Sequence, residues 1–91
     1  AGTYPTEQAR TDAALAAFQQ VVDQYPSTTA GVAARYHHAA SLAATGKYAE
    51  AITGFEAAIA ATDSPLFRAT AKLGLAEAAI AQLNLDALHV L

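Results

Sequence analysis

Residues 34–59, ARYHHAASLAATGKYAEAITGFEAAI, contain two helical segments joined by a break at Thr45-Gly46-Lys47. Glycine can end a helix because it readily adopts the left-handed backbone conformation at a helix C-terminus. After the break, apolar and small residues recur three and four positions apart, which places them on one helical face. These residues are Tyr48, Ala51, Ile52, Phe55, Ala58 and Ile59. The stretch therefore predicts a helical hairpin, with its second helix running from about Tyr48 to Ala61.

The composition indicates the same class of structure for the whole chain. Hydrophobic residues make up 54% of the sequence and charged residues 14%, and 26 of the 91 residues are alanine. Alanine is the best helix former, and the chain has no alternating β-branched pattern of the kind found in strands. We expect an all-α protein. No apolar run approaches the roughly 18 residues of a membrane-spanning helix, so we expect no membrane insertion of this segment.

The segment before the hairpin predicts a single long helix. Pro5 suits a first helical turn, and Pro26 ends the run. Between them, one apolar stripe is formed by Thr11, Leu15, Phe18, Val22 and Tyr25. The next helix is expected to be capped by Ser27, or else by Thr28 or Thr29.

The segment after the hairpin predicts another helix that begins at Ser64-Pro65, a polar cap followed by proline at the first helical position. Its inward stripe is expected to consist of Leu73, Ala76, Ile80 and Leu83. Asn84 is expected to cap a separate last segment, 85–91. The sequence thus predicts about five helices.

The hairpin resembles the tetratricopeptide repeat, a helix-turn-helix unit of roughly 34 residues with small and aromatic residues at fixed offsets. In that resemblance, Gly46 falls on the inter-helix glycine, Tyr48 and Phe55 on the aromatic positions, and Ala51 and Ala58 on the small positions. The resemblance implies one domain over residues 1–91, stacked as a fragment of a right-handed solenoid. It would contain the second helix of a first repeat (5–25), a full repeat (28–62) and a partial third repeat (64–91).

Four residues depart from the repeat pattern. Arg35 stands where a bulky apolar residue is usual, and His38 stands where leucine is usual. Leu83 takes the place of Gly46, and Leu88 takes the place of Ala51. A leucine at a position of close helix approach overpacks a standard hairpin. The last hairpin is therefore not expected to close in the usual way.

The resemblance implies a protein-binding or assembly scaffold whose concave groove receives a peptide or protein segment. Position by position, the groove would be lined by Ala33, Tyr36, Ala40, Ala43, Thr70, Leu73, Glu77 and Ile80. This set is mostly apolar, which disfavours a carboxylate clamp and favours a ligand with an apolar or aromatic anchor. An open alternative is that Tyr36, Leu73 and Ile80 simply pack against a neighbouring repeat or subunit.

The sequence offers no candidate catalytic residues, so we expect no enzyme activity and no cofactor. Glu50, Glu56 and Glu77 lie in no motif with a nucleophile or a phosphate-binding loop. His37 and His38 point about 100° apart on a helix and cannot chelate one metal ion together. The net charge is −3 and the five basic residues are scattered, so nucleic acid is not an expected partner.

Two other functions remain open from the sequence. The leucine-rich end, with Leu83, Leu85, Leu88 and Leu91, could mediate a homodimer or an exchange of C-terminal helices. The segment could instead be a helical appendage of a larger envelope or translocation machine. The Tyr25-Pro26-Ser27 link resembles those of bacterial envelope proteins of the repeat family, which implies a periplasmic or envelope location. The absence of cysteine does not decide the compartment.

Overall fold

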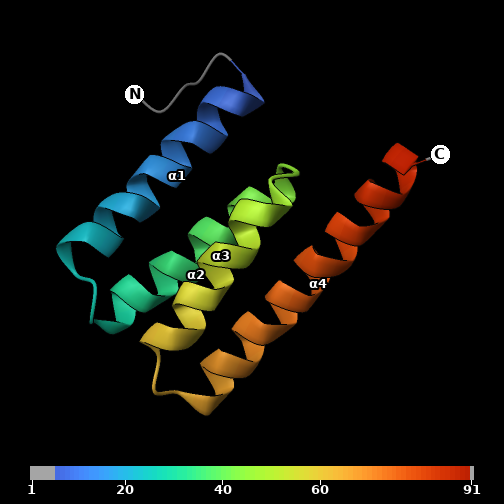
Figure 1. Cartoon of the computed structure of the whole chain (residues 1–91). Helices are drawn as coiled ribbons and strands as arrows, with labels where there is room; N and C mark the ends of the chain where they lie inside the picture. Colours follow the sequence, from blue (N-terminus) through green and yellow to red (C-terminus); the bar gives the residue numbers. More distant parts are fainter. Residues whose placement is uncertain (1–5, 91) are drawn as a thin grey trace.

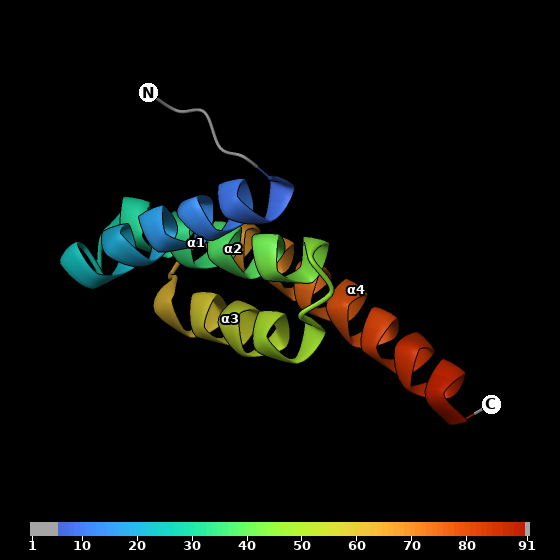
Figure 2. The same cartoon turned by 90° about the horizontal axis from the view of Figure 1, so that it is seen from above.

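The computed structural model describes residues 6–90, which form four α-helices and no strand. These are α1 (Glu7–Gln24), α2 (Thr29–Ala44), α3 (Tyr48–Ala61) and α4 (Pro65–Val90). Each helix packs against the one before it in the chain, and α2 and α4 touch only marginally. Figure 1 shows the four helices in this arrangement, and Figure 2 shows α3 in a layer beside α2. The prediction of an all-α protein is confirmed.

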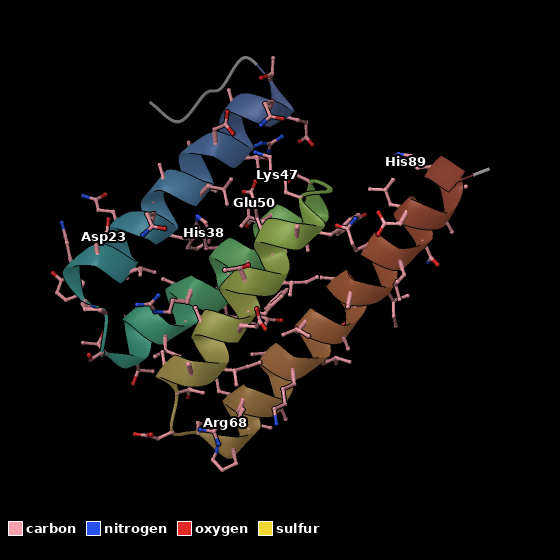
Figure 3. All side chains as sticks on the ribbon, in the orientation of Figure 1. Asp23, His38, Lys47, Glu50, Arg68 and His89 are labelled. Carbon is pink, nitrogen blue, oxygen red and sulfur yellow. The ribbon has the colours of Figure 1, made fainter. Side chains whose placement is uncertain are left out.

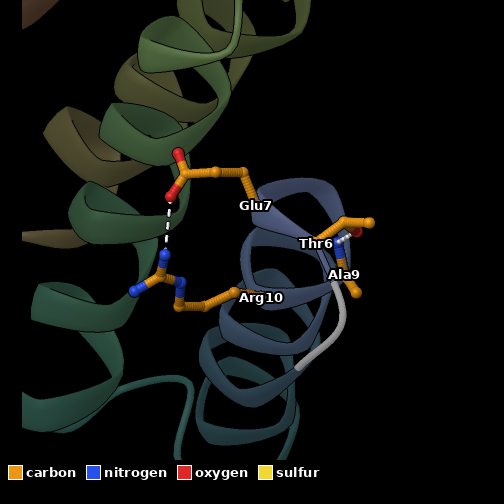
Figure 4. Close-up of polar contacts among 4 residues, drawn as sticks. All are labelled: Thr6, Glu7, Ala9 and Arg10. Carbon is orange, nitrogen blue, oxygen red and sulfur yellow. Dashed lines mark hydrogen bonds and ion pairs between the residues drawn. The ribbon is translucent and has the colours of Figure 1, made fainter. Parts of the chain in front are cut away.

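The first helix begins where its sequence supplies a cap. The Thr6 hydroxyl accepts a hydrogen bond from the backbone N–H of Ala9 at 3.0 Å. Arg10 and Glu7 form an exposed ion pair of 2.6 Å on the same turn (Figure 4). Exposed pairs of this kind contribute little stability, so the cap is the more important contact. The predicted start at Pro5 lies outside the described residues.

The cap of α2 is Thr28 and not Ser27, which was the first choice from the sequence. The Thr28 hydroxyl accepts a hydrogen bond from the N–H of Gly31 at 3.0 Å. The same hydroxyl donates to the carbonyl oxygen of Tyr25 at 2.9 Å. This second bond ties the start of α2 to the end of α1, and it fixes the link between the two helices.

The break at Thr45-Gly46-Lys47 is confirmed as the hinge between α2 and α3. Gly46 has a φ of +84°, the left-handed conformation that glycine adopts without strain. Its N–H donates to the Ala43 carbonyl at 3.1 Å, and the Lys47 N–H donates to the Leu42 carbonyl at 2.9 Å. This pair of bonds is the Schellman motif that closes a helix C-terminus. The predicted bounds of α3 agree with the structure.

The core is made largely of alanine around one aromatic ring. Phe55 is 2% exposed, and its cluster includes Leu42. The alanines that are almost fully buried are Ala39, Ala51, Ala58, Ala71 and Ala78. Small side chains allow the helix axes to approach closely, and Phe55 fills the space that remains between them.

The predicted inward stripe of α4 was wrong. Leu73 is 62% exposed, Ile80 59% and Leu83 67%, whereas Ala71 and Ala78 are buried. The reason is the Phe55 ring, which leaves no room for a side chain at Gly74, the position of α4 that faces it. A Cβ on Gly74 would lie 2.7 Å from that ring. The face with Ala71 and Ala78 therefore turns inward, with Leu75 beside it, and the face with Leu73 and Ile80 turns outward.

The helix α4 also continues through Asn84, so the described residues form four helices and not about five. Asn is only a moderately poor helix former, and no glycine stands here to end the helix. The predicted break at Leu83-Asn84 is therefore absent, and the second half of α4 extends beyond the other helices (Figure 2).

Candidate binding groove

A chain of aromatic rings crosses all four helices, and two of its members, Tyr36 and Phe55, line the candidate site. The ring centre of Tyr36 on α2 lies 5.6 Å from that of Phe55 on α3 and 5.8 Å from that of Phe67 on α4. On its other side, Tyr36 meets His37 edge-on at 5.4 Å, and His37 stacks on Phe18 of α1 at 5.7 Å. Aromatic pairs at these distances attract one another beyond simple burial. Tyr36 is thus held in place from several directions.

Beside Tyr36 lies a groove of about 360 Å³ between α2 and α4, with α3 as its floor. We call it the Tyr36 groove. Its lining residues are Tyr36, Ala40, Ala43, Ala44, Tyr48, Phe55, Gly74, Glu77 and Ala78. The volume lies in the range of small-ligand and side-chain pockets. Among these residues Glu77 alone carries a charge, so the groove is apolar with one acidic group on its α4 wall.

The eight residues predicted to line a groove fall into three groups. Tyr36, Ala40, Ala43 and Glu77 come together in the Tyr36 groove. Ala33 lines a neighbouring pocket of about 470 Å³ together with Ser64 and Phe67.

The third group consists of Thr70, Leu73 and Ile80, which are exposed on α4. At 100° per residue they lie within about 60° of Glu77 around the helix, so they continue the α4 wall outward from the groove.

The sequence did not indicate five residues that line the groove: Ala44, Tyr48, Phe55, Gly74 and Ala78. Tyr48 and Phe55 belong to the hairpin register, and they border the groove from α3 although Phe55 itself is buried. The signal for Gly74 was available. A glycine inside a helix weakens the helix and is usually kept for close packing, here against Phe55.

Charged side chains are spread over all four helices of the described chain. Residues 6–90 contain no cluster of three or more His, Asp or Glu side chains able to hold a metal ion. Figure 3 shows Arg68 at the start of α4 and His89 near its end. Arg68 serves a structural role, because its guanidinium donates to the carbonyl oxygen of Thr62 at 2.6 Å.

None of the described helices is long and apolar enough to cross a membrane. Comparison of the chain with models of protein families, with curated proteins and with solved structures finds no match. The class defined by the structure is that of all-α proteins with four packed helices.

Proposed function

We propose that this chain is a non-catalytic protein-binding module of the tetratricopeptide type that receives a peptide or protein segment in the Tyr36 groove. In this proposal α1 is the second helix of a first repeat, α2 and α3 form a full repeat, and α4 begins a third. The observation that carries the proposal is the groove itself, where residues of α2 and α4 face each other across Phe55. Stacked hairpins leave such rows of side chains free to vary without altering the core.

The lining of the groove specifies the chemistry of its ligand. The alanines on α2 leave space for an apolar or aromatic side chain, which would pack on the ring of Tyr36. Glu77 on the opposite wall would pair with a lysine or arginine next to that side chain. The expected ligand is therefore a segment with an apolar anchor and an adjacent basic residue.

Filling the groove tests the proposal. Peptides selected for binding to the chain from a random displayed library should lose at least tenfold in affinity for Ala40→Leu, because the larger side chain occupies the anchor site. Affinities can be measured by fluorescence anisotropy. Ala16→Leu is the matched control, since Ala16 is exposed on α1 and the substitution adds the same volume elsewhere.

Tyr36→Ala should abolish binding of the same peptides while the helical circular dichroism signal persists. It also removes ring contacts with Phe55 and Phe67, so Ala40→Leu is the cleaner variant. The groove assignment is refuted if no peptide is enriched, or if the enriched peptides bind Ala40→Leu as tightly as the unchanged protein.

A second candidate function, self-association, is favoured by the outer face of α4. Leu66, Leu73 and Ile80 are spaced seven residues apart, and an apolar residue follows three positions after each of them: Ala69, Ala76 and Leu83. This is the heptad spacing of helices that pair with another helix. We call these six residues the α4 seam. Its four large side chains are 59–79% exposed.

A second copy of the chain is a suitable occupant of the α4 seam. Lys72 and Glu77 flank it at the two positions whose side chains meet across a parallel helix pair. Pairing two copies in parallel would bring Lys72 of each near Glu77 of the other. Of the residues named for this role from the sequence, Leu83 and Leu88 are exposed and Leu85 is partly buried, while Leu91 lies outside the described residues.

Sedimentation equilibrium distinguishes this second function from the first. The unchanged chain is expected to dimerise, and the double variant Leu73→Glu with Ile80→Glu is expected to be monomeric, because buried carboxylates oppose the contact. Ala49→Glu with Ala60→Glu adds the same charge to exposed positions of α3 and should leave the dimer intact. A monomer at all concentrations for the unchanged chain, or a dimer that survives the seam variant, would exclude this function.

A further inference from the structure

A second pocket lies on the other side of α2 from the Tyr36 groove. It has a volume of about 370 Å³ and is bounded by α1, α2 and α3. Its lining residues are Gln19, Val22, Arg35, His38, Leu42, Glu50, Thr53, Gly54 and Ala57. Figure 3 shows His38 directed into the space between α1 and α2. Unlike the Tyr36 groove, this pocket contains two basic side chains that come from the same helix.

Arg35 occupies a position that the pattern of α2 reserves for an apolar residue. Val32, Ala39 and Leu42 are buried, and Arg35 falls in their series at a spacing of three and four. Its Nε atom is buried and has no hydrogen-bond partner among the described residues. A buried guanidinium nitrogen without an acceptor is unfavourable, so an arginine at this apolar position of α2 costs stability.

The acidic residue of this pocket does not supply that acceptor. Ala39 of α2 and Gly54 of α3 lie side by side, because a Cβ on Gly54 would be 2.9 Å from the Ala39 Cβ. The two helices run antiparallel, so Arg35 and Glu50 lie on opposite sides of this crossing. Along the helix axes they are separated by about eight residues, or roughly 12 Å. Among residues 6–90 the ion pair found is the one between Arg10 and Glu7.

We propose that this pocket binds a small aliphatic carboxylic acid. A carboxylate accepts two parallel hydrogen bonds from the fork of an arginine, and the Arg35 side chain lines the pocket in which such a group would sit. Val22, Leu42 and Ala57 provide apolar contact for the body of the acid. A monoanion is preferred over a phosphate dianion, because Glu50 borders the same pocket and repels additional negative charge. His38 and Gln19 stand beside Arg35 as further polar partners.

This site is separate from the proposed peptide groove, so the two proposals fail independently. Two residues that depart from the repeat pattern, Arg35 and His38, meet in this one pocket. Places where a sequence breaks its own local rule are frequently functional. The sequence identifies both residues as exceptions to the repeat pattern, and the structure shows that both line the same pocket.

Titration of the full chain with hexanoate, followed by ¹⁵N–¹H NMR, tests the proposal. Saturable shifts are expected at the amides of Gln19, His38 and Gly54. Hexanamide, which has the same shape and no charge, should produce none. Arg35→Leu should weaken hexanoate binding at least tenfold while the protein stays folded, because leucine suits the buried series of α2. Arg10→Leu removes an exposed arginine with the same change of net charge and should bind hexanoate normally.

Three results would overturn the assignment. They are the absence of saturable shifts with hexanoate, equal binding of hexanamide, and an unchanged affinity in Arg35→Leu. Arg35→Gln provides a second test of the charge: it should also lose binding, since a neutral amide cannot form the charge-assisted fork. Retention of full affinity by this variant would equally exclude a carboxylate bound at Arg35.

Discussion

Replacing Phe55 by alanine is expected to lower the free energy of unfolding by about 3–5 kcal/mol, the usual loss for a buried aromatic residue. Phe55 is 2% exposed and packs with Ala39, Leu42 and Ala78, which come from the helices on both sides of α3. Domains of this size have total stabilities of about 5–15 kcal/mol. The variant should therefore lose a large share of the stability of the fold.

Urea unfolding followed by circular dichroism measures this loss. Phe18→Ala serves as the control, because Phe18 is only half-buried at the α1 edge and should give a clearly smaller loss. A decrease below about 1 kcal/mol for Phe55→Ala would mean that the core is centred elsewhere.

A second substitution at Gly74 shows whether the Phe55 ring sets the rotation of α4. In the unchanged protein a Cβ at Gly74 would lie 2.7 Å from the ring, so Gly74→Ala should destabilise the fold. In the Phe55→Ala background that space is open. There, Gly74→Ala should be stabilising by about 1 kcal/mol, because alanine is a better helix former than glycine. The reversal of sign between the two backgrounds is the expected signature.

The local features of the fold could be predicted from the sequence because each depends on residues close together in the chain. Gly46 ends α2 through its own backbone conformation, and Ser64 with Pro65 starts α4 through its own cap. The register of the hairpin followed from the spacing around Phe55. These signals do not depend on what other helices do, so the bounds of α3 could be predicted directly.

The rotation of α4 could not be predicted in the same way, because this helix is apolar on two faces. Ala71 and Ala78 mark one face, and Leu73 and Ile80 mark the other. Hydrophobicity alone favours burial of the leucines. The steric demand of Phe55 selects the face with small residues, and it arises only when α3 and α4 are in contact.

The candidate sites show the same difference between what local spacing predicts and what depends on helix packing. The α2 side of the Tyr36 groove followed from the hairpin register, whereas the α4 side depended on a rotation that the sequence left open. Arg35 and His38 were recognisable as exceptions in an apolar pattern. The residues that surround them, such as Gln19 and Val22, come from α1, and their arrival depends on how the α1–α2 link folds.

A large loss of stability is also expected for Gly31→Ala, a substitution in the link between α1 and α2. A Cβ on Gly31 would lie 1.8 Å from the carbonyl oxygen of Tyr25, which is far too close for two heavy atoms that are not bonded to each other. The oxygen is fixed by the Thr28 hydroxyl, which donates to it at 2.9 Å. The loop must therefore move, and we expect a loss of about 3 kcal/mol, at the upper end of overpacking effects.

The control for Gly31→Ala separates crowding from backbone conformation. Gly46→Ala has open space around its Cβ but a φ of +84°, so it should cost only about 1 kcal/mol. Thermal unfolding of the two variants measures the difference. Equal losses would show that close approach at Gly31 is not what joins α1 to α2.

Gly31→Ala also distinguishes the two proposed sites, because α1 contributes residues to the pocket that contains Arg35 and none to the Tyr36 groove. Gly31→Ala is expected to displace α1 and with it Gln19 and Val22, which form one wall of the pocket that contains Arg35. The Tyr36 groove is built from α2, α3 and α4 and contains no residue of α1. Hexanoate binding should therefore be lost in this variant while the selected peptides still bind. Loss of both would mean that α1 supports the whole stack, and retention of both would mean that the link can relax without moving α1.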